Sequence, residues 1–133
     1  MEKLRVLMIA PGEHPAISEL EPTMQAFKNA VNIGADDDGD PRTMRLSKEI
    51  YALYNLDGYF CNLKGNRKVK NRIICGDFYI VGVTDDNLPR SLNSAEIVKY
   101  QRKYWTCEKF EEHELLLSAF AAYNKELEEN EIM

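Results

Sequence analysis

The sequence predicts a single α+β domain, with a small mixed or antiparallel sheet of about four strands and helices packed on one side of it. Residues 4–10, 50–54 and 78–83 are short, mostly apolar runs, which are typical of β-strands. Apolar residues recur every three or four positions in residues 20–31, and this spacing predicts a helix with one buried face. At 133 residues the chain has room for one core, because a domain of this size buries about two-thirds of its unfolded surface.

The N-terminal third is predicted to hold one interior strand and one helix. The run from Leu4 to Ala10 is apolar at nearly every position, as in a strand covered on both faces, and Pro11-Gly12 ends it. Pro22 suits the first turn of a helix, which we expect to stop near Gly34. The apolar stripe of this helix consists of Leu20, Met24, Phe27 and Val31.

The central stretch is predicted to form a β-hairpin over residues 55–63. The run from Ile50 to Tyr54 would be one strand and the run from Tyr59 to Leu63 the returning one, joined at Asp57-Gly58. An Asp-Gly pair between two such runs favours a type I′ turn, which needs positive φ at both central residues. Residues 43–48 are compatible with either a short strand or a helical turn. The run from Phe78 to Val83 is apolar on both faces, so we expect a third, interior strand there.

The last third of the chain is predicted to be helical. Asn93 and Glu96 have the spacing of a capping box, which predicts a helix over residues 94–104. Thr106 is a candidate cap for a final helix. We therefore divide the chain into an α+β domain of residues 1–104 and a C-terminal helical extension of residues 105–133, packed on the same single domain.

Composition and charge indicate a cytoplasmic protein that does not enter a membrane. The chain carries 17 basic and 22 acidic side chains, and the basic ones are concentrated in residues 42–104. Both ends are acidic, which compensation of charge within the molecule would explain. Cys61, Cys75 and Cys107 are odd in number and widely spaced, as expected in a reducing compartment. No apolar run approaches the ~20 residues that a membrane-spanning helix needs.

The residues that carry common enzyme chemistry do not form a recognisable set in this sequence. His14 and His113 are the two histidines, and neither stands in a nucleophile–base motif. Cys107 and His113 are not at the spacing that places two residues on one helix face, and no Cys-x-x-Cys motif occurs. No glycine-rich phosphate loop is present either. We therefore predict no catalytic residues, no metal site and no cofactor, and a protein that is not an enzyme.

Residues 64–72 are the strongest local candidate for a binding site. We predict a loop here, and its concentration of basic residues would suit phosphate groups. Alternatively, the loop is solvated and its charge balances the acidic final helix. Asn66-Arg67 has two further interpretations, an anion clamp or a buried arginine that fixes the loop. The candidate binding residues are Lys64, Asn66, Arg67, Lys68, Lys70 and Arg72.

Aromatic residues near the C-terminal end indicate a different kind of site. Large aromatic side chains are typical anchors of protein interfaces, although packing on the protein's own sheet would also explain them. An isolated helix of this length would be marginally stable in water, so a helix that did not pack at home would need a partner or a second copy. The candidate interface residues are Trp105, Phe110, Phe120 and Tyr123.

Several ordered pieces of the chain resemble an uncharacterised family, the domain of unknown function 3846. The matching pieces lie within residues 3–104 and include Leu4–Gly12, Asn55–Gly58, Asn66-Arg67 and Ile73–Gly82. The resemblance implies a small α+β domain carried mostly by bacteria, phages and conjugative elements, without an established activity. An Asp-rich loop stands where the family's strand after the first helix is expected, and the final helix lies outside the shared region.

These observations lead to three functional hypotheses. The first is a small cytoplasmic accessory protein of a mobile element or prophage that acts by protein–protein interaction, with a protein partner or through self-association. The second is a nucleic-acid-binding module that uses residues 64–72, although an acidic chain lacks the general basic field of most such proteins. The third, suggested only by the acidic ends, is a DNA mimic that inhibits a host enzyme.

Overall fold

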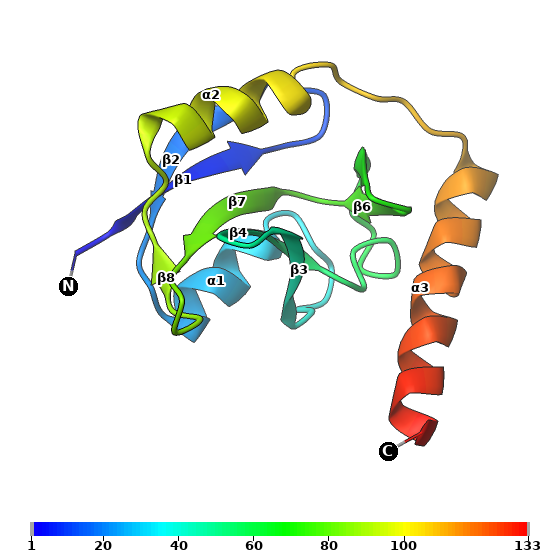
Figure 1. Cartoon of the computed structure of the whole chain (residues 1–133). Coiled ribbons are helices and arrows are strands. Elements are labelled where there is room, and N and C mark those ends of the chain that lie inside the picture. Colours follow the sequence, from blue (N-terminus) through cyan, green and yellow to red (C-terminus); the bar gives the residue numbers. More distant parts are fainter. Residues whose placement is uncertain (1, 133) are drawn as a thin grey trace.

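The centre of the protein is an antiparallel sheet (Figure 1). The computed structural model describes residues 2–132, and their side chains from residue 2 to residue 125. The strand order is β2 (Ala16–Leu20), β1 (Leu4–Ile9), β7 (Phe78–Val83), β4 (Ile50–Asn55) and β3 (Pro41–Ser47), and the short β8 (Pro89–Arg90) pairs with β7. The predicted α+β class is confirmed, and the sheet has six strands within the described part of the chain.

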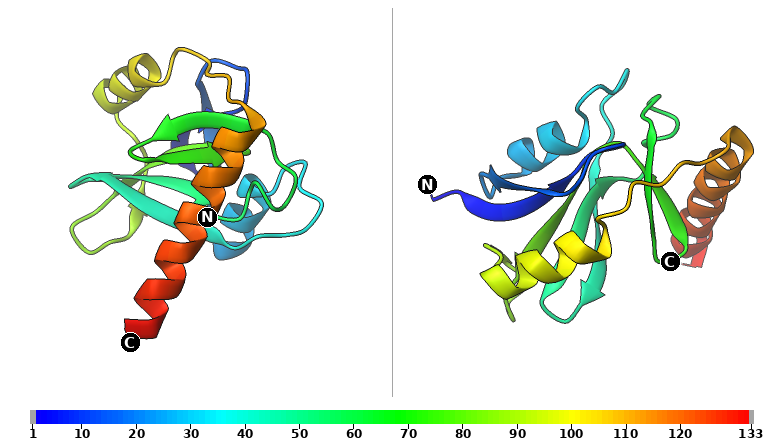
Figure 2. Two further views of the ribbon diagram at one scale, coloured as in Figure 1. Left: turned by 90° about the vertical axis from the view of Figure 1, so that its right-hand side faces the viewer. Right: turned by 90° about the horizontal axis from the view of Figure 1, so that it is seen from above.

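Helices cover both faces of this sheet, so the prediction that they pack on one side is wrong (Figure 2). The helix α1 (Met24–Val31) packs Ala30 and Val31 against one face. The helix α2 (Ser94–Lys103) packs Ile97 and Tyr100 against the other. Every residue of β4 and β7 is buried, and a sheet whose central strands are apolar on both faces requires cover on both.

Both of these helices begin at caps formed by side chains. Thr23 Oγ1 accepts a hydrogen bond from the Ala26 amide at 3.1 Å, so α1 begins at Met24 rather than at Pro22. Met24 is 69% exposed and does not belong to the buried stripe in which the sequence placed it. The predicted capping box of α2 is confirmed, because Asn93 and Glu96 exchange two side chain–backbone hydrogen bonds of 2.9 Å.

The predicted return strand at 59–63 does not form, and residues 56–62 make a series of turns instead. β4 pairs with β3 along one edge and with β7 along the other, which leaves no edge for a hairpin partner after it. The ambiguous segment before β4 is a strand, β3, and supplies that pairing. Gly58 is required in the turns, because a Cβ there would lie 2.3 Å from the Cys75 carbonyl oxygen.

The basic segment predicted to be a loop is a second, two-stranded sheet. Strand β5 (Gly65–Val69) pairs antiparallel with β6 (Arg72–Cys75), and Lys70 and Asn71 form the turn between them. Val69 and Ile74 are buried with the α2-side core, so this hairpin adds cover to that face of the main sheet. Lys70 has a φ of 56°, in the left-handed region that tight hairpin turns use.

The final helix α3 (Glu112–Ile132) stands beside this hairpin, at one end of the molecule (Figures 1 and 2). It begins at Glu112, and Thr106 lies in the extended linker that leads to it, so the prediction of a cap at Thr106 is wrong. The linker and the helix each contact an edge of the hairpin. Glu108 Oε2 accepts from the Lys68 amide, and Ser118 Oγ accepts from the Ile73 amide, both at 2.9 Å.

Candidate protein interface and basic groove

Arg67 is fully buried and ties the small hairpin to two distant segments of the chain. Its guanidinium donates to the carbonyl oxygens of Ala10 (3.2 Å) and Glu13 (2.6 Å), which lie in the loop after β1. It also donates twice to the carbonyl oxygen of Tyr104, at 3.0 and 3.2 Å, directly after α2. These contacts match the interpretation of Arg67 as a buried arginine that fixes its segment.

Asn66 completes this network and is also fully buried. Its Oδ1 accepts from Arg67 at 2.7 Å, and its Nδ2 donates to the carbonyl oxygens of Ile9 and Gly76, each at 2.8 Å. The amide and the guanidinium therefore face backbone carbonyls and not solvent. The anion-clamp interpretation of Asn66-Arg67 has no accessible guanidinium to support it.

The structure divides the six candidate binding residues into three groups. Asn66 and Arg67 are internal, whereas Lys64 and Lys68 are exposed along β5 and the residue before it. Lys70 and Arg72 line a groove at the turn end of the hairpin, between β3 and α3. Of the six candidates, only Lys70 and Arg72 therefore lie together in one site.

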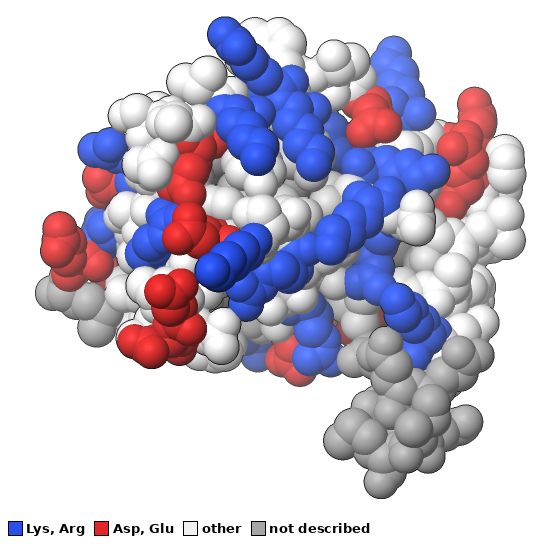
Figure 3. Space-filling view, viewed as in Figure 1, with Lys and Arg blue, Asp and Glu red and all other residues white. Residues whose placement is uncertain are grey.

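This groove, which we call the basic groove, holds about 470 Å³ of open space and continues into a further hollow of about 220 Å³. Its cations come from four separate elements. A space-filling view shows Lys and Arg side chains in a nearly continuous band across this face of the molecule (Figure 3). The basic residues that line the two hollows are Arg42 in β3, Lys70 in the turn, Arg72 in β6 and Lys125 in α3.

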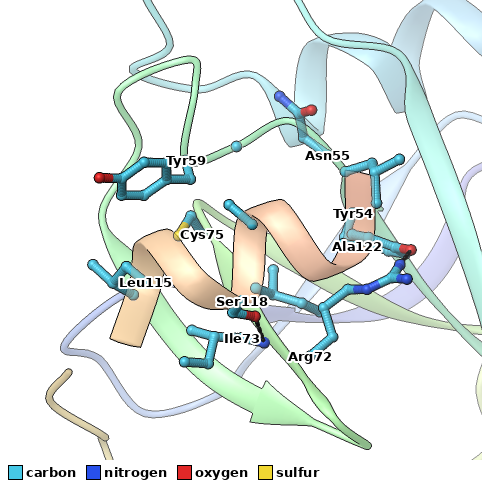
Figure 4. Close-up of a pocket in the computed structure, with 13 residues that line it drawn as sticks. Tyr54, Asn55, Tyr59, Arg72, Ile73, Cys75, Leu115, Ser118 and Ala122 are labelled. Carbon is cyan, nitrogen blue, oxygen red and sulfur yellow. Dashed lines mark hydrogen bonds between the residues drawn. The ribbon is translucent and has the colours of Figure 1, made fainter. Parts of the chain in front are cut away.

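Arg72 is held in place at the floor of the groove by Tyr54. Its Nη1 donates a hydrogen bond to the Tyr54 hydroxyl, and its guanidinium carbon lies 5.6 Å from the centre of the same ring. Figure 4 shows the Arg72 side chain reaching Tyr54 along the side of α3. The Tyr54 ring is buried and is not available to stack on a ligand.

The inner face of α3 packs closely against β6 and the turns that follow β4. Ser118 lies over the Ile73 amide, and Leu115 and Ala122 flank it (Figure 4). The space enclosed between these elements is about 10 Å³, which is no larger than one water molecule occupies. At the start of the helix, the Tyr59 hydroxyl donates to Glu112 at 2.5 Å, and this contact raises the Tyr59 pKa.

The outer face of α3 is apolar and exposed, and we call it the outer stripe. Leu117 is 67% exposed, and Phe120 and Tyr123 are each 47% exposed. Phe60 continues this surface from the neighbouring turns, because its ring meets the Phe120 ring edge-to-face at 5.6 Å. The large side chains of the outer stripe are Leu116, Leu117, Phe120 and Tyr123, with Phe60 beside them.

Only two of the four predicted interface residues belong to the outer stripe. Phe120 and Tyr123 lie on it, whereas Trp105 is in the linker, where its ring stacks on His14 at 3.9 Å. Phe110 is half-buried against β5 near Gly65. The other members of this surface, Leu116, Leu117 and Phe60, were not among the predicted interface residues. A helical projection of α3 would have shown the two leucines beside Phe120, but Phe60 joins them only through the tertiary fold.

Cys61, Cys75 and Asp77 are titratable side chains in the described part of the chain whose pKa values are raised by burial. Burial raises the pKa of the Cys75 thiol to about 11 and also raises the pKa of Cys61, so neither is a nucleophilic thiolate at neutral pH. Burial raises the pKa of Asp77 as well. No group of three or more His, Cys, Asp or Glu side chains converges on a common point within this part of the chain. None of its helices is both long and apolar enough to cross a bilayer.

The fold and these two surfaces define a small α+β domain that carries a basic groove and an exposed helical extension. The chain belongs to the family described as domain of unknown function (DUF3846), which matches residues 4–105. No curated protein and no solved structure matches the chain. The family match ends before α3, so the outer stripe and Lys125 lie outside the region that defines the family.

Proposed function

We propose that this protein is a small accessory protein that acts by protein–protein interaction through the outer stripe of α3, and that the stripe pairs with a second copy of the chain. The observation that carries the proposal is the exposure of four large apolar side chains on a single face of one helix. Exposed apolar patches of this kind mark interaction sites, because soluble proteins rarely leave large ones uncovered.

Two sides of α3 are apolar: the inner side is packed on β6, whereas the outer side remains largely exposed apart from the contact of Phe120 with Phe60. At about 100° per residue, Leu116, Leu117, Phe120 and Tyr123 fall within a sector of about 120°. Leu115 and Ala122 lie on the opposite side, packed on β6. A helix that is apolar on all sides is usually buried on all sides. The second side of α3 therefore lacks a cover that another chain would supply.

The outer stripe is suited to an antiparallel pairing with itself. If the two-fold axis passes beside Phe120, each Leu117 meets Tyr123 of the second copy and the two Phe120 rings meet each other. Residues 115–124 contain no charged side chain, so this pairing brings no like charges together along the stripe. Lys125 lies on the flank of the helix that faces the groove.

The area of the patch is sufficient for a modest dimer. Large side chains bury about 150–250 Å² each when fully covered, and those of the stripe and Phe60 are roughly half exposed. Each copy therefore offers roughly 500 Å² of surface, or about 1,000 Å² for both copies together. This total is at the lower end of specific interfaces, so we expect a dimer of micromolar affinity.

Sedimentation equilibrium and light scattering over about 10 to about 500 μM protein test this proposal. The wild-type chain is expected to dimerise, and the double variant Leu117→Gln, Phe120→Gln is expected to dimerise at least about tenfold more weakly. Ala121→Gln is the matched control, because Ala121 is exposed on the groove side of the same helix. Circular dichroism checks that all three proteins keep the same helix content.

A wild-type chain that stays monomeric throughout this range would overturn the pairing, and so would a double variant that dimerises as well as the control. A monomeric chain whose outer stripe retains a different protein, with loss of that protein in the double variant, would replace the second copy by another partner. The family resemblance supports a setting in a prophage or other mobile element, in the cytoplasm. The basic band in Figure 3 gives no support to a DNA mimic, which would need an acidic surface.

A further inference from the structure

We propose that the basic groove binds a phosphate group, carried either by a nucleotide or by a nucleic-acid strand. This site is separate from the outer stripe, because it lies on the opposite flank of α3. The proposal narrows the predicted nucleic-acid site of residues 64–72 to Lys70 and Arg72. It adds Lys125 and Arg42, which only the tertiary structure brings to them.

The composition of the groove favours an anion. Lysine and arginine side chains from β3, the β5–β6 turn, β6 and α3 surround it, and none of the described residues that line either hollow is acidic. Lys70 and Arg72 form no ion pair with a described carboxylate. Cations gathered from separate elements repel one another, and a bound anion relieves that repulsion. The space enclosed between α3, β6 and the turns after β4 holds only about 10 Å³, which is too small for the ligand. We therefore place the ligand in the open groove.

The geometry of Arg72 suits phosphate in particular. Its hydrogen bond to Tyr54 and its contact with the Tyr54 ring fix the guanidinium plane, and the remaining N–H groups are available for an oxyanion. Thr43 adds a hydroxyl donor at the wall of the groove. A fixed fork, flanking ammonium groups and a hydroxyl are the donors that phosphate oxygens use in proteins.

The shape of the groove indicates that the phosphate is recognised and that a base is not. A volume of about 470 Å³ accommodates a phosphate with its sugar, and the groove is open at its surface. Among the described residues that line the groove, Tyr54 is the one aromatic residue, and it is only 3% exposed, so these residues present no ring for stacking. The ligand should therefore bind without strong preference for sequence, and its affinity should depend steeply on salt.

Two probes separate the sources of the phosphate. Fluorescence anisotropy with a short fluorescein-labelled thymidylate oligonucleotide measures strand binding by the full chain, between about 50 and about 200 mM salt. Titration of pyrophosphate into isotopically labelled protein, followed by NMR, measures binding of phosphate alone through shifts of the Lys70, Asn71 and Arg72 amides.

Lys70→Asn and Lys125→Gln are the test variants. Asparagine tolerates the positive φ at residue 70, and the residue 125 side chain is exposed, so both variants should fold. Each should weaken binding by about two- to fivefold and lower the salt slope by about 0.7. Lys48→Asn is the control, because it makes the same charge change in a turn roughly 16 Å further along β3.

Binding of both probes, lost in the test variants and kept in the control, identifies a strand as the phosphate source. Binding of pyrophosphate alone, with the same pattern of loss, identifies a small phosphate compound. The proposal is overturned if neither probe binds, or if binding does not depend on salt. Equal loss in Lys48→Asn and the test variants would also overturn it, because binding would then follow net charge and not the groove.

Discussion

Replacement of Arg67 is the sharpest test of what holds this fold together. The variant Arg67→Ala removes a fully buried guanidinium and leaves the carbonyl oxygens of Ala10, Glu13 and Tyr104, together with Asn66 Oδ1, without their donor. A buried acceptor that loses its partner costs about 1–3 kcal/mol. Water that enters the vacated space recovers part of this, so we expect a net loss of about 3–5 kcal/mol.

This loss is large compared with the stability of an ordinary domain, which is about 5–15 kcal/mol. The midpoint of thermal unfolding should fall by roughly 10–20 °C. Urea denaturation measures the loss directly, and the single tryptophan, Trp105, is a suitable fluorescent reporter because it lies one residue after Tyr104. Arg67→Lys should cost about 1–2 kcal/mol less than Arg67→Ala, because an ammonium group still reaches one or two of the carbonyl oxygens.

Lys68→Ala is the control for this experiment, since Lys68 follows Arg67 on β5 but its side chain is exposed. Its stability should change by less than about 0.5 kcal/mol. If Arg67→Ala lost less than about 1 kcal/mol, the argument that this network joins the hairpin to the loop after β1 and to the end of α2 would be refuted.

Two further predictions concern pH. Glu96 accepts two hydrogen bonds from Arg90, at 2.8 and 2.9 Å, and these lower the Glu96 pKa below the ordinary 4.5. The contribution of the Glu96 carboxylate to the stability of the fold is therefore present at neutral pH and is lost as the pH falls through the lowered pKa. Glu96→Gln should therefore lose about 1 kcal/mol at neutral pH and little in acid, and an equal loss at both pH values would contradict this. Burial and the nearby Glu13 raise the Asp77 pKa above 3.8, so native stability should fall as the pH rises from 3.8 to the raised value. Asp77→Asn should remove that fall, so urea denaturation should show this variant to be more stable than the wild type at neutral pH. A less stable variant would contradict the prediction, because it would show that the Asp77 carboxylate stabilises the fold.

The strands and helices that were predicted correctly are those with a strong local signal. The apolar runs that became β1, β4 and β7 are buried on both faces, and the Asn93–Glu96 spacing produced the capping box of α2. The error at 59–63 has a different origin. Asp57-Gly58 has the sequence of a hairpin turn, but both edges of β4 are taken by β3 and β7, so the chain turns without pairing. A turn signal fixes local geometry and not the strand that pairs across it.

The candidate site was predictable only in part, for a similar reason. The sequence placed Lys70 and Arg72 in one basic segment. They do lie together, because they are only two positions apart at the turn of one hairpin. It grouped Arg67 with them, although alternation along β5 turns Arg67 inward and leaves Lys68 outside. Arg42 and Lys125 come from β3 and α3, and no local pattern relates them to residue 72.

The order of apolar and polar residues determined by itself that this chain forms an α+β domain, where its central strands run and where α2 begins, because those features depend on neighbours within a few positions. The tertiary structure decided the rest. It placed helices on both faces of the sheet and buried Arg67, whose guanidinium joins the small hairpin to two distant segments. It also left the outer stripe of α3 exposed and brought the cations of the basic groove together. Each of these depends on which distant segments share an edge or a face, and such pairings are set by the packing of the whole chain.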